Sequence, residues 1–265
     1  MKLRAAIAVF CVAGLPATAE VGPLPPADIY VLGEVHDNPA HHDEQARLVA
    51  QIAPTALVFE MLSPMQALAA AGAARDDPAD LERVLNWAES GWPDFSMYAP
   101  IFAAAPDAII VGAAVPKDDL NAAVEFGAAQ VFGAQARHWG LGDLDAGALD
   151  SRLAEQRDVH CGALPDDMLP GMVEAQRLRD AVFARETVGA FDAAGGPVVL
   201  ITGSGHARTD RGVPAAIRDA RPELTVWALG QVEKGAAPPF PYDAVNVTPA
   251  AERDDPCAAF DSPAE

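Results

Sequence analysis

The sequence predicts an α/β fold with a mainly parallel or mixed central sheet flanked by helices. Three observations support this prediction. Five short apolar runs, mostly β-branched and without polar alternation, are typical of strands that are covered on both faces. Helix start signals lie between these runs, and an alternation of strand and helix is typical of a parallel sheet. A long Ala-rich stretch predicts an additional helical layer from residues 115–195.

The predicted elements follow one another along the chain. The strands are Ile29–Gly33, Ala56–Met61, Ala108–Ala113, Pro197–Thr202 and Leu224–Leu229. Three pairs of a capping side chain and a proline favour helices that begin there, and these are Asn38-Pro39, Ser63-Pro64 and Asp77-Pro78. Further helices are expected at Asp118–Phe132, Asp143–Arg157 and Asp166–Phe191. Ala236–Pro241 and the last dozen residues are expected to be extended.

Residues 1–19 have the three parts of a secretory signal peptide in the right order. A positive amino end precedes the apolar segment Ala5–Leu15, which is too short to span a bilayer, and Ala17-Thr18-Ala19 supplies the small residues of a cleavage site. A buried first helix is the alternative. Cleavage near Ala19 would leave residues 20–265 as a single α/β domain in a periplasmic or secreted protein.

Charge and cysteine content restrict the partners. The full chain has 18 basic and 38 acidic residues and a net charge of −20, which becomes −22 once Lys2 and Arg4 are removed. This charge argues against nucleic acid or an anionic membrane surface as a partner. Only Cys161 and Cys257 follow the signal. Two cysteines in an exported protein favour one disulfide, with two free thiols as the alternative.

The same short motif ends two of the predicted strands. Gly33-Glu34-Val35-His36 and Gly203-Ser204-Gly205-His206 both read Gly-x-x-His, although 170 residues separate the two histidines. The carboxyl ends of parallel strands meet at one edge of a sheet, where ligands bind, so we expect the two histidines to converge. Glu60 ends the second predicted strand at the same edge, which we name the rim.

The expected rim residues support three interpretations. They are Glu34, His36, Glu60, His206 and Arg208, with Asp37 and Asp210 nearby. Two histidines with carboxylates form a set of metal ligands, which would be His36, His206, Glu34 and Glu60. The same groups could serve as general acid and base. They could also form a hydrogen-bonded network that only orders the loops.

Two pairs of polar residues near the rim have an ordinary and a functional interpretation. His41 and His42 lie in the first turn of the helix after His36, where we expect them at the surface, with a place in the site as the alternative. Gln176 and Asp180 share one helix face, which would be solvated or would form the far wall of the site.

An aromatic group before residue 103 also has two interpretations. It consists of Trp87, Trp92, Phe95, Tyr98 and Phe102. Such a group suits a flat apolar ligand, and ordinary packing between helices in the core would produce it equally well.

Several segments resemble the ChaN family of haem-binding uptake proteins, over about residues 27–260. They are LGEVHDN, VFEM, HCGALP, AQRLRDAVFA, ITGSGHARTDRGVP and ERDDPCAAF. The family belongs to a wider group with Tiki-type metalloproteases, TraB/PrgY proteins and erythromycin esterases. The resemblance implies an α/β fold with both Gly-x-x-His motifs at the pocket, and it supports the pairing of Cys161 with Cys257.

The resemblance implies haem, or a small apolar molecule, as the ligand. It also implies a homodimer that encloses stacked haems and an outer-membrane haem uptake system as partners. The family uses a tyrosine as axial ligand, and Tyr98 is the candidate, because Tyr30 lies early in a buried strand and Tyr242 in a Pro-rich segment. The other expected haem-binding residues are His36, His206, Arg208 and Trp92.

The Tiki and esterase branches imply a hydrolase that uses the same rim. A divalent metal ion would activate water, or His36 would act as a general base. The catalytic set would then be Glu34, His36, Glu60, His206 and Arg208. Haem acquisition and hydrolysis are therefore the two functional hypotheses, and an inactive scaffold is the third.

Overall fold

A computed structural model of the chain describes residues 23–236, 241–255 and 257–258. The predicted signal peptide, most of Ala236–Pro241 and most of the tail lie outside these residues. In the described part, six strands form one sheet in the order β3-β2-β4-β1-β5-β6, and all neighbouring strands are parallel. The α/β prediction is confirmed, and the described sheet is wholly parallel.

Five of these strands are the predicted ones. They are β1 (Ile29–Glu34), β2 (Ala56–Phe59), β3 (Ile109–Gly112), β4 (Val198–Gly203) and β5 (Val226–Glu233). The sixth, β6 (Ala244–Thr248), is absent from the prediction. It is an edge strand that buries Asn246 and Thr248 and exposes Val245 and Val247, so no apolar run marks it in the sequence.

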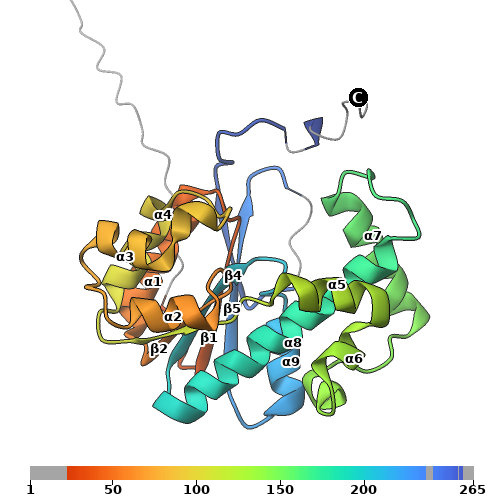
Figure 1. The fold of residues 1–265 in the computed structure, drawn as a ribbon, viewed down its shortest axis with the longest axis horizontal. Helices are drawn as coiled ribbons and strands as arrows, with labels where there is room; N and C mark the ends of the chain where they lie inside the picture. The colour runs from red at the N-terminus through yellow and green to blue at the C-terminus, as the bar shows by residue number, and fades with distance from the viewer. Residues whose placement is uncertain (1–22, 237–240, 256, 259–265) are drawn as a thin grey trace, which may run out of the picture.

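One face of the sheet is covered by the helices that lie between β1 and β3 (Figure 1). They are α1 (Pro39–Ile52), α2 (Pro64–Ala70), α3 (Pro78–Leu85), the 3-10 helix η1 (Trp87–Glu89) and α4 (Phe95–Ala104). The predicted caps are present, because the side chains of Asn38, Ser63 and Asp77 each accept a hydrogen bond from an amide in the first turn.

The opposite face is covered by helices that come mainly from the predicted additional layer (Figure 1). They are α5 (Lys117–Phe126), α6 (Ala128–Phe132), η2 (Ala136–Trp139), α7 (Ala146–Val159), α8 (Leu169–Ala194) and α9 (Val213–Ala220). The long helix α8 contacts β2, β3 and β4. Among the described helices, none is both long and apolar enough to cross a membrane.

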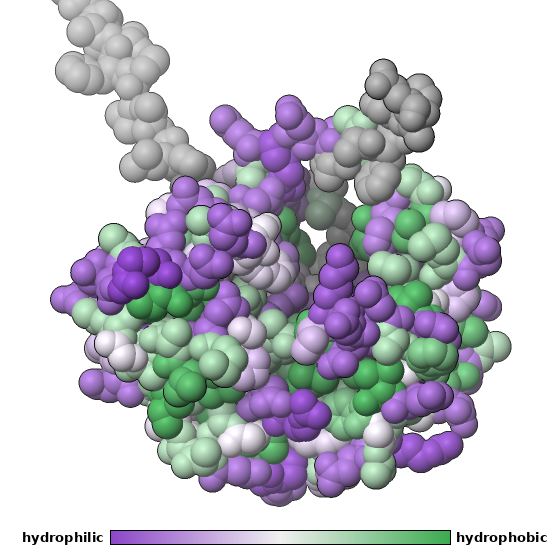
Figure 2. All heavy atoms as spheres, viewed as in Figure 1, coloured by the Kyte–Doolittle hydropathy of each residue, from purple (hydrophilic) through white to green (hydrophobic). Residues whose placement is uncertain are grey.

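Successive residues of a strand pack into two separate cores. Ile29 and Val31 of β1 are buried in the core beneath α8 and α9, whereas Tyr30 and Leu32 are buried in the core beneath α1 and α4. With both faces covered, the rim is the part of the sheet where a ligand can meet strand-end side chains. Figure 2 shows the molecule hollowed between the two groups of helices on this side.

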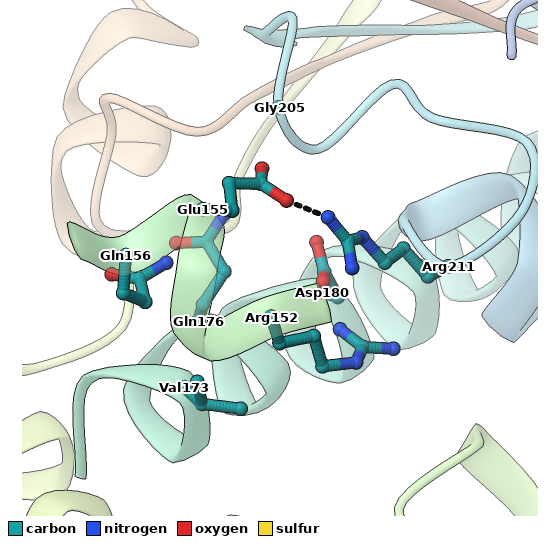
Figure 3. A pocket seen from close by; sticks show the side chains of 8 residues that line it. All are labelled: Arg152, Glu155, Gln156, Val173, Gln176, Asp180, Gly205 and Arg211. Carbon is teal, nitrogen blue, oxygen red and sulfur yellow. Dashed lines mark ion pairs between the residues drawn. The ribbon is translucent and has the colours of Figure 1, made fainter. Parts of the chain in front are cut away.

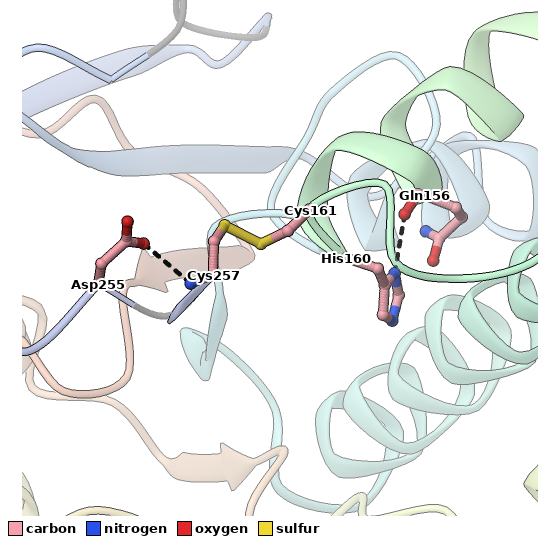
Figure 4. The surroundings of a disulfide bond; sticks show 5 residues. All are labelled: Gln156, His160, Cys161, Asp255 and Cys257. Atoms are coloured by element: carbon pink, nitrogen blue, oxygen red, sulfur yellow. Dashed lines mark hydrogen bonds between the residues drawn. A yellow bond between two sulfur atoms is a disulfide. The ribbon is translucent and has the colours of Figure 1, made fainter. Parts of the chain in front are cut away.

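A disulfide joins the C-terminal segment to the end of α7. Cys161 and Cys257 are bonded, with Cα atoms 5.6 Å apart (Figure 4). A ring nitrogen of His160 donates to the Gln156 carbonyl beside it, and the Asp255 side chain accepts from the Cys257 amide. The predicted pairing of the two cysteines is therefore present.

Candidate functional site

The two Gly-x-x-His motifs lie side by side because β1 and β4 are neighbours. Glu34 is opposite Gly203 in the parallel register, and the Ser204 amide donates to the Glu34 carbonyl at 2.8 Å. This approach requires a glycine at position 33, since a Cβ there would lie 2.8 Å from the Leu229 carbonyl oxygen and 2.9 Å from the Ser204 Cα. The strands therefore bring the two motifs together, as the sequence predicts.

A buried carboxylate, Glu34, is the centre of the first half of the site. Its Oε1 accepts hydrogen bonds from His36 Nδ1 at 2.7 Å and from the Tyr98 hydroxyl at 2.8 Å. Its Oε2 lies 3.5 Å from His42 Nδ1, and neither atom has a hydrogen-bond partner among the described residues. His42 donates through Nε2 to the His36 carbonyl at 2.8 Å. We name Glu34, His36, His42 and Tyr98 the Glu34 cluster.

The expected surface positions of His41 and His42 are wrong, because both side chains are fully enclosed. His41 Nδ1 accepts from the Val35 amide at 2.8 Å, and its Nε2 lies 2.8 Å from the Thr248 hydroxyl. β6, which no apolar run marks in the sequence, covers His41, whereas His42 packs against Tyr98 of α4 with ring centroids 4.3 Å apart. Burial is the main reason that the pKa of His41 falls to about 4, so this ring is neutral.

His36 is the accessible member of the Glu34 cluster. Its side chain is 32% exposed, and its ring centroid lies 4.8 Å from that of Trp92. Burial alone would lower the pKa of His36, but the Glu34 hydrogen bond and the charges of Glu60 and Glu34 raise it. The Nε2 atom faces Gly203, where a Cβ would lie only 3.1 Å from it. Gly203 thus leaves space beside this nitrogen.

The second half of the site is built around His206. Its Nδ1 lies 2.7 Å from Asp180 Oδ1, and its Nε2 lies 3.7 Å from Glu60 Oε1. The Gln176 amide nitrogen is 3.2 Å from the same Nδ1. The helix face that carries Gln176 and Asp180 therefore belongs to the site. Burial lowers the pKa of His206, and the carboxylates of Glu60 and Asp180 outweigh that effect and raise it.

Glu60, at the end of β2, lies between the two halves. Its Oε2 accepts from the Thr202 hydroxyl at 2.6 Å and from the Gly203 amide at 2.8 Å. Burial would raise the pKa of Glu60, but the charges of His206 and His36 and these hydrogen bonds lower it. An ionised carboxylate therefore connects the two histidines electrostatically.

Arg208 lies away from the Glu34 cluster. Its guanidinium is buried and donates to Asp210 at 2.7 and 2.9 Å and to Glu155 of α7 at 3.1 Å. The structure thus places Arg208 on the α7 side of the site, where carboxylates surround it.

The aromatic group divides into four buried residues and one accessible residue. Trp87, Phe95, Tyr98 and Phe102 are buried in the core, whereas Trp92 is half-buried and contacts His36. The Tyr98 hydroxyl is held by Glu34, and burial together with the Glu34 charge raises the pKa of Tyr98 far above its ordinary value. A tyrosinate is therefore disfavoured at this position.

The expected metal ligands do not form a metal centre. Across the described residues, no three His, Cys, Asp or Glu side chains are placed to hold a metal ion. The Nδ1 atoms of His36 and His206 face different carboxylates, Glu34 and Asp180. The set His36, His206, Glu34 and Glu60 therefore does not fit a single divalent ion, and no step through one is derived.

Comparisons with known proteins add a family and a fold. A family model described as haem-binding uptake, Tiki superfamily, ChaN matches residues 21–217. A solved structure of ChaN of Campylobacter jejuni, described with cofacial haem binding, has a TM-score of 0.61 at 19% identity and covers 83% of this chain and 86% of its own. That likeness shows a shared fold.

Other solved structures are more distant. An erythromycin esterase in an open conformation has a TM-score of 0.43 at 12% identity and covers 79% of this chain and 71% of its own. A succinoglycan biosynthesis protein has a TM-score of 0.38 at 11% identity and covers 78% and 66%. Similarity at this level supports no functional argument. A comparison with curated proteins gives no match.

Proposed function

Because the chain belongs to the ChaN family of haem-binding uptake proteins in the Tiki superfamily, we propose that it binds haem at the rim as a transported ligand. The observation that carries the proposal is the pairing of the two Gly-x-x-His motifs, with His36 as their accessible imidazole against Trp92. A flat apolar ring and an imidazole at one opening suit a porphyrin with a central iron.

We assign the contact with the iron to His36. Its Nδ1 is held by Glu34, which leaves Nε2 as the nitrogen that can coordinate. A carboxylate on the far nitrogen fixes the ring and makes the free nitrogen a better donor. Tyr98 supports this arrangement by donating to the same Glu34 oxygen. Ligation by Tyr98 itself would require its hydroxyl to leave Glu34 and lose a proton in a buried position.

Titration of the purified protein with hemin tests this function. We expect a saturable shift of the Soret band at micromolar hemin, and roughly tenfold or greater loss of affinity in His36→Ala, because an axial bond is lost. His138→Ala is the control, since His138 is an exposed histidine away from the rim. Absence of saturable binding, or equal loss in both variants, would refute the assignment.

The proposal includes export and assembly. Residues 1–19 and the Cys161–Cys257 disulfide support a periplasmic or secreted location. A haem on the partly open face beside His36 would leave one side uncovered, which supports a homodimer that encloses two haems. Delivery from an outer-membrane haem uptake system would supply the ligand. Cell fractionation tests the location, and sedimentation with and without hemin tests the homodimer.

A hydrolase is the second candidate function, and the observation that favours it is the 2.7 Å contact between His206 and Asp180. A carboxylate–histidine pair of this kind can orient a general base. The raised pKa of both His206 and His36 opposes this use, because the neighbouring carboxylates make each ring hold a proton more strongly than a free imidazole does. Elemental analysis and ester turnover, compared between the natural protein and His36→Ala, would detect the activity.

A further inference from the structure

A half-buried arginine on the His206 side of the site has no hydrogen-bond or ion-pair partner among the described residues. Arg152 of α7 makes no hydrogen bond or ion pair to any described residue, and its Nε is enclosed by protein. Burial lowers the pKa of Arg152, and the charge of Asp180 only partly offsets this. A guanidinium that is partly withdrawn from water and has no partner destabilises a fold unless something else binds it.

Arg211, just before α9, lies beside Arg152. Its side chain is 13% exposed and pairs with Glu155, which also accepts from Arg208. Burial and the positive charge of Arg152 lower the pKa of Arg211 to about 10. Figure 3 shows both guanidiniums directed into the space beside Asp180. Two arginines that repel each other in a partly buried space favour an anion between them.

Two cavities meet at this arginine pair. One is lined by Gln176 and Gly205 next to His206, and the other extends beneath α9 to Trp139; Arg152, Asp180 and Arg211 line both. The indole Nε1 of Trp139 is also buried without a described partner. Two donors without acceptors around one space indicate that an acceptor group binds there.

Three of the four acidic side chains that line these cavities already have partners. Asp180 is held by His206, Asp210 by Arg208, and Glu155 by Arg208 and Arg211. Asp219 lines only the cavity beneath α9. None of these four carboxylates makes a hydrogen bond or ion pair with Arg152, although the charge of Asp180 acts on it.

We propose that Arg152 and Arg211 form a carboxylate site, and that in the loaded protein a propionate of the haem fills it. The proposal rests on haem binding at the rim. His206 connects the two places, since it contacts Asp180 on one side and Glu60 on the other, and Glu60 acts on His36. Paired guanidiniums match the geometry of a carboxylate.

A comparison of hemin with its dimethyl ester tests whether the arginine pair binds a propionate. In the ester the two propionates carry no charge. Arg152→Gln should weaken hemin binding by roughly tenfold, the usual size of a charge-assisted contact, and should leave ester binding unchanged. Arg157→Gln is the matched control, because Arg157 lies on the same helix in an exposed ion pair with Asp166. If hemin binds and Arg152→Gln binds it as tightly as the natural protein, the propionate assignment is overturned.

A free carboxylic acid is the other source of the same chemistry, and succinate without hemin tests it. One outcome is that succinate raises the melting temperature of the natural protein but not of Arg152→Gln, while hemin and its ester bind with equal affinity. In that case the site serves a free acid, and the propionate assignment fails. If no hemin binds, the rim proposal fails, and the succinate result alone decides whether an anion site exists. Arg152→Gln should melt no lower than the natural protein, since Arg152 makes no contact that folding needs.

Discussion

The protonation of one side chain, His36, links the electrostatics of the rim to ligand binding. Its imidazole needs a free Nε2 to coordinate iron, and a proton on that nitrogen competes with the metal. Glu34 and Glu60 raise the pKa of His36 above its ordinary 6.5. The same carboxylates that orient the ring therefore also make it hold a proton more strongly.

Hemin affinity should consequently increase with pH. Below the raised pKa of His36 the ring is protonated and cannot coordinate, so the affinity should rise as the pH increases from 6.5 through that value, and then level off. Titrations at a series of pH values measure this profile. His36→Ala supplies the comparison, and its profile should lack the rise. A rise that persists in His36→Ala would assign the effect to another group.

The variant Tyr98→Phe shows whether the Tyr98 hydroxyl only holds Glu34 in place or binds the haem iron itself. The change removes one of the two donors to a buried carboxylate oxygen and should lower the free energy of unfolding by about 1–3 kcal/mol. Urea denaturation measures this loss. Tyr30→Phe should cost less, because the Tyr30 hydroxyl donates to the Pro25 carbonyl and accepts from the Ala27 amide, and neither partner is charged. The Soret band of the hemin complex should keep its position in Tyr98→Phe; a loss of tyrosinate character would instead make Tyr98 the ligand.

At the scale of the elements, the close approach of β1, β4 and β5 depends on the first glycine of the first motif. The backbones of Ser204 and Leu229 occupy the space into which a side chain at position 33 would project. Backbone atoms of central strands cannot move aside as a flexible side chain can. The motif therefore starts with a glycine for a packing reason, independently of the ligand.

Gly33→Ala should lower the free energy of unfolding by about 1–3 kcal/mol through overpacking. Gly72→Ala is the matched control, because a Cβ at position 72 would meet nothing within 4 Å, and it should be nearly neutral. Thermal melts of the two variants test the difference. Equal melting temperatures would show that the three strands can separate slightly without loss of stability.

Most of the strands could be predicted because burial on both faces of the sheet requires a continuous run of apolar residues. Ile29–Gly33 is apolar throughout for that reason, and the capping residues before α1 and α2 mark where helices begin. β6 has no such apolar run, because this edge strand buries only alternate residues and the buried ones, Asn246 and Thr248, are polar. The burial of His41 follows from β6 and that of His42 from its packing against Tyr98 of α4, and neither contact could be predicted from the sequence.

The candidate site could be predicted only where it depends on strand ends. The parallel topology was enough to place His36, Glu60 and His206 together. Arg152 was not predictable, because Arg152 and Arg157 occupy the same helix and look alike in sequence. Only the packing of α7 against α8 leaves Arg152 half-buried and Arg157 exposed.

At the scale of the whole molecule, the disulfide closes a large part of the chain. Cys161 and Cys257 are 96 residues apart, and the loop contains α8, α9 and three strands of the sheet. Restricting a loop of this length should stabilise the protein by about 5 kcal/mol in the chain-entropy description.

Reduction with dithiothreitol should therefore lower the urea midpoint of the natural protein. The variant Cys161→Ser/Cys257→Ser should have the lower midpoint without reductant and should not respond to it. Denaturation curves with and without reductant measure both effects. If the curve of the natural protein is the same in both conditions, the bond is either absent in solution or irrelevant to global stability.

The order of strands in the sheet also determines at what stage of synthesis the rim can form. β1 leaves the ribosome early, yet both of its neighbours, β4 and β5, are made more than 160 residues later. Thr248, which contacts His41, comes later still. Contacts between such distant segments form slowly, and an incomplete chain cannot form them. A chain that stops before β4 has one motif and no second strand to set beside it, so occupancy of the rim would report that synthesis had been completed.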